Sequence, residues 1–376
     1  MLNIDRLVYI SLLVIVILYF SQGIVILSPT VGQILLALIY VISISYLIRM
    51  TMSTQKFHRI MKPLILFMLM IFFGYLFSDN YAEYNILKSA LLNFLPFFPF
   101  YYFAKKDLLT SKDIGYVFFV LLLLFIIKFQ TTAENLMLEK FNDDILVNNT
   151  SYLFIGLLSF VFFIKNRIIA ICSLIVICLF IVQSLKRGPF LAGTLSLILF
   201  VIQMFYKSHV RLNKLYGLLL LVFILGFIIF EFKFLIENEF LVTRLNEMLE
   251  GESSGRNYIA LKAFQKWYYL GNFSTYLFGQ GYNSVKNITG HFSHNDWLDM
   301  LVSYGFFGLF LYLCIYIVLF LEILSKGWNA EKKIILIQFF LIAILTSLTS
   351  RWYWSNFAFT QMIILPYLFV TKNKPI

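Results

Sequence analysis

The chain has 376 residues, of which 61% are hydrophobic and only 13% are charged. Soluble domains carry about 25% charged residues, so the composition excludes an ordinary soluble protein. A net charge of +11 would suggest a nucleic-acid partner in a soluble protein. Here most lysines and arginines lie in short loops between apolar runs. We therefore expect no nucleic acid and interpret the charge as a signal of membrane topology.

Apolar blocks of about 20 residues recur along the chain, the length that an α-helix needs to cross a bilayer. The blocks are solidly apolar and do not alternate, which favours helices over a β-barrel. We predict an all-α, polytopic membrane protein with about twelve transmembrane helices, in which 1–376 form a single integral membrane domain. The predicted spans are 7–27, 31–50, 61–77, 86–104, 114–130, 149–164, 168–185, 189–206, 215–232, 297–322, 333–350 and 353–370.

Alternate loops are basic, and the loops between them are acidic or neutral. By the positive-inside rule, the basic loops and both termini are predicted to be cytoplasmic. The long polar segment 233–296 then lies outside the cytoplasm. The basic loops and the tail contain Arg49, Lys56, Arg59 and Lys62, then Lys105, Lys106 and Lys112, then Lys165 and Arg167, then Lys207, Arg211 and Lys214, then Lys326, Lys332 and Lys333, and finally Lys372 and Lys374.

The long external segment is predicted to contain two helices. The first covers Leu235–Leu249, and the second covers Gly255–Leu270 after a possible cap at Ser253 and Ser254. One interpretation of the second helix is that it lies on the membrane surface, anchored by Trp267, Tyr268 and Tyr269. That interpretation is compatible with a functional role for Arg256 at its start.

Three basic residues lie on the external side, where the charge rule predicts none. Lys186 and Arg187 occupy a tight turn with Gly188 and Pro189, and Arg351 lies in the turn between the last two spans. A charge at membrane depth costs at least about 2.5–3.5 kcal/mol. One interpretation is that these side chains extend to lipid phosphates. The other is that they bind an anionic ligand, since the arginine fork donates two hydrogen bonds to one phosphate.

His294 precedes a predicted span and is the candidate general base. Ser293 and Asp296 before an apolar run are typical of a capping box, which predicts that Ser293 caps a helix beginning near His294. The cap gives His294 itself no role. Imidazolium is disfavoured at a helix N-terminus, and a neutral imidazole can accept a proton. A structural histidine is the alternative.

We expect no metal and no cofactor. His291 and His294 have the spacing of a ligand pair, but no assured third ligand accompanies them. Cys172, Cys178 and Cys314 all fall inside apolar runs, and none of them is spaced like a metal site.

Several motifs follow one another over 184–309. A Lys-Arg-Gly turn at 186–188 precedes Gly255-Arg256, the run Leu277-Phe278-Gly279-Gln280-Gly281, and His294-Asn295, which is followed after nine residues by Gly305-Phe306-Phe307-Gly308-Leu309. This combination resembles the O-antigen polymerase and O-antigen ligase superfamily of bacterial envelope glycosyltransferases. The resemblance also covers the overall plan of spans. Close helix packing is the physical account we expect for Gly305 and Gly308.

The resemblance implies a metal-independent, inverting glycosyl transfer at the periplasmic face of the bacterial inner membrane. The donor would be an oligosaccharide on undecaprenyl diphosphate, a membrane lipid. Arg187 and Arg256 would hold the diphosphate and stabilise it as the leaving group, and His294 would activate or position the acceptor hydroxyl. The substrate would also contact Lys186, Asn295, Asp296 and Arg351.

The motifs around 278–281 and 293–297 look more like those of polymerases, which join one lipid-linked repeat unit to another and would work with a chain-length regulator protein. The alternative within the superfamily is a ligase that transfers glycan to lipid A-core. A transporter or flippase is a third hypothesis. That class is expected to carry charges near the bilayer midplane and repeated halves, and this sequence has no such repeat.

Overall fold

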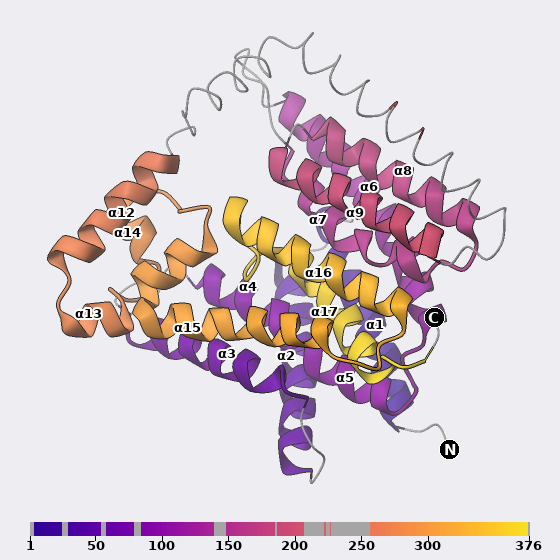
Figure 1. The fold of residues 1–376 in the computed structure, drawn as a ribbon, viewed down its shortest axis with the longest axis horizontal. Coiled ribbons are helices and arrows are strands. Elements are labelled where there is room, and N and C mark those ends of the chain that lie inside the picture. The colour runs from indigo at the N-terminus through magenta and orange to yellow at the C-terminus, as the bar shows by residue number, and fades with distance from the viewer. Residues whose placement is uncertain are drawn as a thin grey trace.

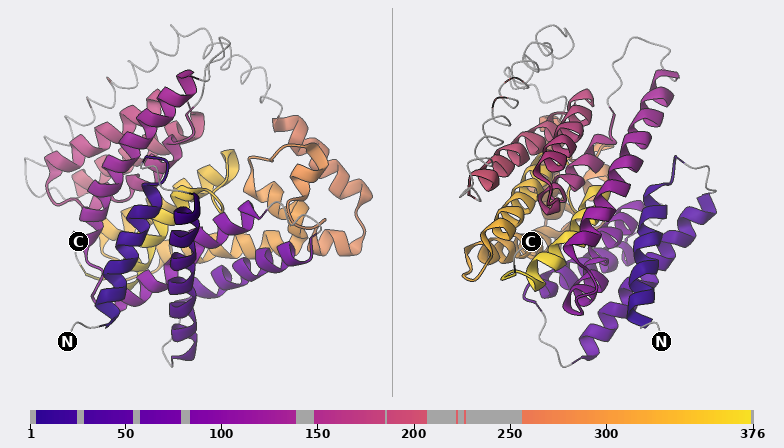
Figure 2. Two further views of the ribbon diagram at one scale, coloured as in Figure 1. Left: turned by 180° about the vertical axis from the view of Figure 1, so that it is seen from behind. Right: turned by 90° about the vertical axis from the view of Figure 1, so that its right-hand side faces the viewer.

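The computed structural model describes residues 4–24, 29–53, 58–78, 84–138, 148–184, 186–206, 222, 226 and 256–374. Every regular element among these residues is helical, which confirms the predicted all-α class. Figure 1 shows a bundle of helices with α12, α13 and α14 set to one side of it, and Figure 2 shows the same arrangement from behind and from the right.

The helices follow the chain in order. The first part contains α1 (Ile4–Phe20), α2 (Pro29–Met52), α3 (Met61–Leu76), α4 (Asn85–Phe94), α5 (Phe97–Lys105), α6 (Ser111–Leu138), α7 (Ser151–Leu158), the 3₁₀ helix η2 (Val161–Phe163), α8 (Arg167–Gln183) and α9 (Arg187–Tyr206). The second part contains α12 (Arg256–Leu270), α13 (Phe273–Phe278), α14 (Ser284–Thr289), α15 (Asp296–Leu324), α16 (Ala330–Thr349) and α17 (Asn356–Val370).

Four of these helices are long and apolar enough to cross a membrane: α2, α6 over Ser111–Glu134, α15 and α16. Five further apolar segments are shorter, with 10–17 residues each. The helices lie close to the predicted spans because long apolar runs favour helices whose backbone groups are all paired internally. The predicted span 215–232 and the predicted helix Leu235–Leu249 fall outside the described residues, apart from positions 222 and 226.

The predicted span 86–104 is not a single helix. The chain forms two short helices, α4 and α5, which meet at Leu95 and Pro96. The physical reason is that Pro96 and Pro99 have no backbone N–H, so two of the hydrogen bonds that would continue α4 are missing. The segment 149–164 is likewise shorter than predicted, because α7 ends at Leu158 and only a 3₁₀ turn follows it.

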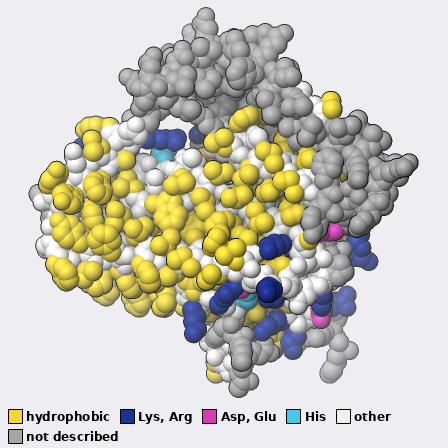
Figure 3. All heavy atoms as spheres, viewed as in Figure 1, with side chains coloured by type: hydrophobic (Ala, Val, Ile, Leu, Met, Phe, Trp, Pro, Cys, Tyr) yellow, Lys and Arg dark blue, Asp and Glu magenta, His cyan; other side chains and the backbone are white. Residues whose placement is uncertain are grey.

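The core of the bundle is made by α5, α7 and α17. Every residue of α17 from Phe357 to Phe369 is buried, and so is every residue of α5 from Phe97 to Ala104. The surrounding helices α1, α2, α3, α6, α9 and α15 instead expose large hydrophobic side chains. Figure 3 shows a broad hydrophobic face with basic side chains gathered along its lower margin. Such a surface is suited to lipid and not to water, so the chain has the character of a membrane protein.

Several of the described basic segments lie near one another at one end of the bundle. Asp5 accepts a hydrogen bond of 2.7 Å from Arg49, and Lys374 lies 3.1 Å from Asp107. Arg59 donates a 2.6 Å hydrogen bond to the buried Glu322. These contacts join the N-terminal residues, the loops near 59 and 107, and the C-terminal tail, while the predicted basic loop 207–214 lies outside the described residues. We call this region the basic end.

The helix predicted over Gly255–Leu270 is confirmed as α12. Part of its apolar face packs against the protein. Ala263 and Trp267 are buried against Val285 and Val302, which belong to α14 and α15. Trp267 is therefore not a surface anchor, whereas Tyr268 and Tyr269, the other two residues of that interpretation, are exposed.

Candidate functional site

A break in α15 holds the motif Gly279-Gln280-Gly281 in place. Gly305 interrupts the helix with φ 66° and ψ −161°, a conformation that only glycine adopts readily. The break frees two carbonyl groups, those of Val302 and Ser303, and these accept hydrogen bonds of 2.9 and 3.0 Å from the backbone N–H groups of Gln280 and Gly281. The segment that follows α13 is therefore hydrogen-bonded through its backbone to α15, next to the break.

The expected close-packing role is confirmed for both glycines, and Gly305 has the additional role of a positive φ. A Cβ on Gly305 would lie 2.5 Å from the carbonyl carbon of Leu277 and 2.6 Å from the amide nitrogen of Gly279. A Cβ on Gly308 would come within 3.2 Å of the sulfur of Met70 on α3. Gly305 is thus needed for backbone conformation and close approach together, while Gly308 allows two helices to pack.

The predicted cap at Ser293 is also wrong, because Asn295 caps α15. The Asn295 side chain accepts a 3.1 Å hydrogen bond from the backbone N–H of Leu298. Ser293 instead closes the turn before the helix, where its hydroxyl donates to the carbonyl of Asn295 at 2.9 Å. Asn295 therefore has a structural role: it fixes the start of α15 at Asp296, two residues after His294.

Asp296, predicted to bind substrate, is fully buried and does not line the cavity described below. Its Oδ2 accepts hydrogen bonds from the Tyr312 hydroxyl at 2.8 Å and from the backbone N–H of Trp352 at 2.7 Å. Its Oδ1 is buried without a hydrogen-bond partner among the described residues. In this structure Asp296 attaches the start of α15 to the loop that carries Arg351, and its assignment to the substrate stays a prediction.

Arg351 is buried, with 6% of its surface exposed, and its side chain does not extend toward lipid. Its guanidinium carbon lies 3.9 Å from the ring centroid of Phe292 and 4.0 Å from that of Trp354. Its Nε and Nη2 atoms are buried without a hydrogen-bond partner among the described residues. Burial lowers the pKa of this guanidinium, and the nearby charge of Asp299 opposes that shift. The aromatic contacts hold the guanidinium in place.

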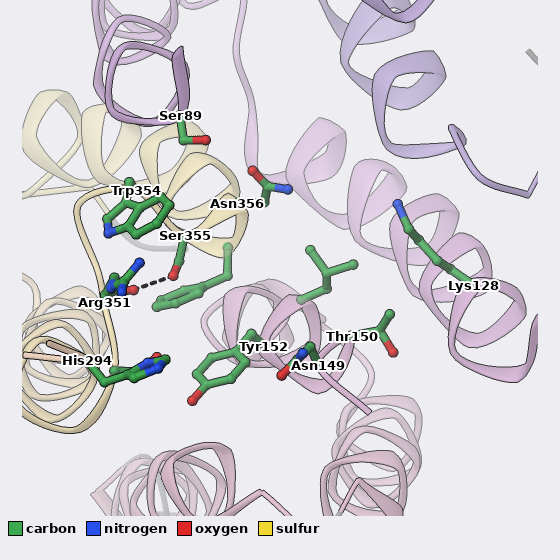
Figure 4. A pocket seen from close by; sticks show the side chains of 13 residues that line it. Ser89, Lys128, Asn149, Thr150, Tyr152, His294, Arg351, Trp354, Ser355 and Asn356 are labelled. Atoms are coloured by element: carbon green, nitrogen blue, oxygen red, sulfur yellow. Dashed lines mark hydrogen bonds between the residues drawn. The ribbon is translucent and has the colours of Figure 1, made fainter. Parts of the chain in front are cut away.

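Arg351 lines a cavity of about 440 Å³, which lies at the end of the bundle opposite the basic end. Figure 4 shows Arg351, His294 and Trp354 on one side of it, Lys128 on the other, and Tyr152 and Asn149 between them. No acidic residue is among the described residues that line it. The lining residues are Ser89, Lys128, Asn149, Thr150, Tyr152, Leu153, His294, Ser350, Arg351, Trp354, Ser355, Asn356 and Phe357.

His294 sits in the left-handed backbone region, with φ 50°, which is uncommon for a residue other than glycine. Burial, and then the positive charges of Arg351, Arg256 and Lys186, lower its pKa from 6.5 to about 4. The imidazole lines the cavity, so part of it is exposed. The protein atoms around it shield the rest from bulk water. The imidazole is therefore neutral at pH 7, as predicted. Burial is the largest cause of this lowered pKa, followed by the charges of Arg351, Arg256 and Lys186.

Three of the basic residues singled out by the sequence, Arg351, Arg256 and Lys186, lie close enough to His294 for their charges to act on it. Arg256 donates a 3.1 Å hydrogen bond to the carbonyl of Thr349, at the end of α16, and Lys186 precedes α9. Gly188 lies close to the hydroxyl groups of Thr349 and Tyr152. A Cβ at this position would be 3.2 Å from the first and 3.4 Å from the second. The backbone of Arg187 begins α9, and its side chain lies outside the described residues.

Several lining residues were missed by reasoning from the sequence. Lys128 lies inside the predicted span 114–130, and a charged residue within an apolar run was a signal that could have found it. Asn149 and Thr150 belong to the external loop 131–150, which the sequence indicated as a candidate lining of the site without giving these residues individual roles. Tyr152 and Asn356 carried no signal, because polar and aromatic residues at helix ends are common in membrane proteins.

The described residues contain no group of three or more His, Cys, Asp or Glu side chains that could hold a metal ion. The site instead combines cations, a neutral imidazole, and amide and hydroxyl groups. Such a set of groups can bind an anion and accept a proton near it. No family model matches the sequence, and no curated protein matches it either.

Proposed function

We propose that the chain is an O-antigen polymerase, a glycosyltransferase that moves a glycan from undecaprenyl diphosphate to another lipid-linked repeat unit. One observation carries the proposal: the buried guanidinium of Arg351, with two unpaired nitrogens, lines a cavity beside the neutral imidazole of His294. An unpaired buried donor is costly unless a ligand pairs with it. A diphosphate supplies the acceptors and the negative charge.

The proposed reaction uses the cations for the leaving group. The hydroxyl oxygen of the acceptor sugar attacks the anomeric carbon of the donor while the bond from that carbon to the diphosphate oxygen breaks. The electron pair leaves with the lipid diphosphate. Arg351, together with Arg256 and Arg187, stabilises the negative charge on this leaving group, which lowers the barrier because the donors are already in position.

His294 takes the proton of the attacking hydroxyl. Its pKa of about 4 means that the imidazole is free to accept a proton at pH 7, although it is a weak base in the empty cavity. Binding of a diphosphate offsets the charges of Arg351, Arg256 and Lys186, which are causes of the low pKa. We expect the bound substrate to raise the basicity of His294 at the step that needs it.

The proposed orientation follows from the two ends of the bundle. The basic end faces the cytoplasm by the positive-inside rule, so the cavity opens on the periplasmic side of the inner membrane. Both termini are then cytoplasmic, the span count is about twelve, and the segment 233–296 is periplasmic. The lipid carrier would reach the cavity from the bilayer, and a chain-length regulator would act on this side.

The test is a deletion strain complemented with His294→Gln, Arg351→Met or Arg256→Ala. We expect the ladder of surface glycans to collapse to core with a single repeat unit, as it does without the gene. Lys374→Gln is the matched control, since it removes an exposed cation at the basic end, and it should restore the full ladder. Protein in the membrane fraction is measured for every variant.

The result also separates the alternatives. Bare core with polymer retained on the lipid carrier would show a ligase and overturn the polymerase assignment. Repeat units confined to the cytoplasmic leaflet would show a flippase. An unchanged ladder in the deletion strain would exclude all of these roles in O-antigen assembly.

A further inference from the structure

A second cation lines the cavity opposite Arg351, and the reaction proposed above does not use it. Lys128 lies on α6, across the cavity from Arg351 and His294 (Figure 4). It falls within Ser111–Glu134, a stretch long and apolar enough to cross a membrane. An ionisable side chain in such a stretch is costly, so a compensating partner is expected.

Lys128 has a structural partner among the described residues. Its Nζ donates a 3.0 Å hydrogen bond to the carbonyl of Gln22, just beyond the end of α1. A lysine near a helix C-terminus is favourable because that end carries partial negative charge. A carbonyl, however, occupies one of three ammonium donors and brings no full negative charge. The positive charge therefore remains uncompensated by any acidic residue among those that line the cavity.

The groups near Lys128 on this wall are neutral and polar. Asn149 and Thr150 both line the cavity, and Asn149 is exposed. The Thr150 hydroxyl donates to Asn148 at 2.6 Å, which leaves its lone pairs free to accept. Amide and hydroxyl groups of this kind bind the hydroxyls of a sugar. We call these three residues, Lys128, Asn149 and Thr150, the lysine wall.

The cavity has room for two groups at once. Its volume of about 440 Å³ lies in the range of pockets that enclose ligands of drug size, roughly 300–1,000 Å³. A diphosphate against Arg351 would leave the lysine wall for the attached or the accepting saccharide. The Tyr152 side chain lies between the two sides (Figure 4), where a sugar ring could stack on it.

We propose that the lysine wall binds an acidic sugar, a saccharide unit bearing a carboxylate, and that the natural glycan of this protein contains one. The inference rests on the proposed function, because it takes the cavity to hold a lipid-linked glycan with its diphosphate at Arg351. The carboxylate pairs with the ammonium of Lys128, and the sugar hydroxyls bind Asn149 and Thr150. The lysine wall thereby selects among repeat units.

The experiment compares two probes that differ only in charge. The full chain is purified in detergent, and binding of trigalacturonate and of its fully methyl-esterified form is measured by calorimetry. We expect the acidic probe to bind at least about tenfold more tightly, a difference typical of a partly desolvated ion pair. Lys128→Met should abolish this preference, and Lys128→Arg should retain it.

The wild-type comparison needs no variant, so it decides the matter even if Lys128→Met fails to fold. Equal affinity for the two probes would overturn the proposal, and so would an unchanged preference in a folded Lys128→Met protein. A third probe, inorganic phosphate, tests the other source of negative charge. Phosphate binding that depends on Lys128, without any preference for the acidic trisaccharide, would assign the wall to a second phosphate and also overturn it.

A separate arm keeps the two proposals apart. Inorganic diphosphate should bind in a manner that depends on Arg351 and not on Lys128. If diphosphate fails to bind while the acidic probe is still preferred, the polymerase assignment is lost and the acidic-sugar site stands. If diphosphate binds and the preference is absent, the reverse holds.

Discussion

Asp296 accepts a 2.7 Å hydrogen bond from the backbone N–H of Trp352, and this contact joins the first residue of α15 to the loop between α16 and α17. His294 precedes the first of these elements and Arg351 lies on the second. The Tyr353 hydroxyl adds a parallel contact, a 3.2 Å hydrogen bond to Asp299. The relative position of base and guanidinium is therefore set by buried carboxylates that do not line the cavity.

The first prediction concerns this positioning. Asp296→Ala leaves buried N–H groups without an acceptor, so we expect it to lower the free energy of unfolding by about 1–3 kcal/mol and to weaken diphosphate binding. Asp296→Asn keeps an acceptor and should recover part of both losses. Calorimetry and denaturant unfolding measure them. Asp107→Asn is the control, because Asp107 is exposed at the basic end, and an equal loss in that variant would contradict the positioning role.

The second prediction concerns the break in α15. Gly305→Ala places a Cβ 2.5 Å from the Leu277 carbonyl in a backbone conformation that disfavours alanine, so we expect a loss of stability of at least about 1–3 kcal/mol. Gly115→Ala is the matched control within α6. A Cβ there meets no atom within 4 Å, and the change should stabilise the helix by up to about 1 kcal/mol. Equal unfolding temperatures of the two variants would show that the break is not constrained.

Long apolar runs made most of the helices predictable, because any run that spans a bilayer must pair its own backbone groups. The breaks were harder to predict. Pro96 was visible in the sequence, yet proline is tolerated in membrane helices and did not reveal two separate helices. The positive φ of Gly305 was not predictable, because it depends on contacts with the distant loop at Gly279. From the sequence alone, Gly305 therefore looked like a glycine that lets helices pack closely.

Part of the candidate site was also predictable from the sequence. Lys186, Arg187 and Arg351 stood out because basic residues on the external side violate the charge rule, and His294 stood out as an imidazole just before an apolar span. The contact of Asp296 with Trp352 was not predictable, since a capping pattern does not reveal a tertiary partner 56 residues away. The pairing of Arg351 with aromatic rings also arises only from folding.

The third prediction tests the geometry of Arg351. Arg351→Lys keeps a positive charge but loses the planar fork held by Phe292 and Trp354, so we expect diphosphate to bind at least about tenfold more weakly. Titration with inorganic diphosphate measures the change. Wild-type affinity in Arg351→Lys would mean that charge alone is recognised. Lys374→Gln should bind diphosphate as the wild type does.

The fourth prediction concerns stability and pH. The pKa of His294 is about 4 in the folded protein against an ordinary value of 6.5, so between these values the unfolded chain binds more protons. Stability is then complete above about pH 6.5 and falls as the pH decreases toward 4. His294→Gln should lose this contribution, giving a flatter dependence over that window. The unfolding temperature is recorded from pH 7 to pH 4 for both proteins, and identical slopes would contradict the depressed pKa.

The last prediction links this titration to catalysis. In kcat/KM the acid limb reports the pKa of the free enzyme, so it should lie near pH 4. In kcat it reports the substrate complex, where the bound diphosphate offsets the charges of Arg351, Arg256 and Lys186, and it should therefore lie at higher pH. Chain extension with purified lipid-linked repeat units supplies both profiles. An acid limb at the same pH in kcat and kcat/KM would mean that substrate binding leaves the basicity of His294 unchanged, and its persistence in His294→Gln would assign the base to another residue.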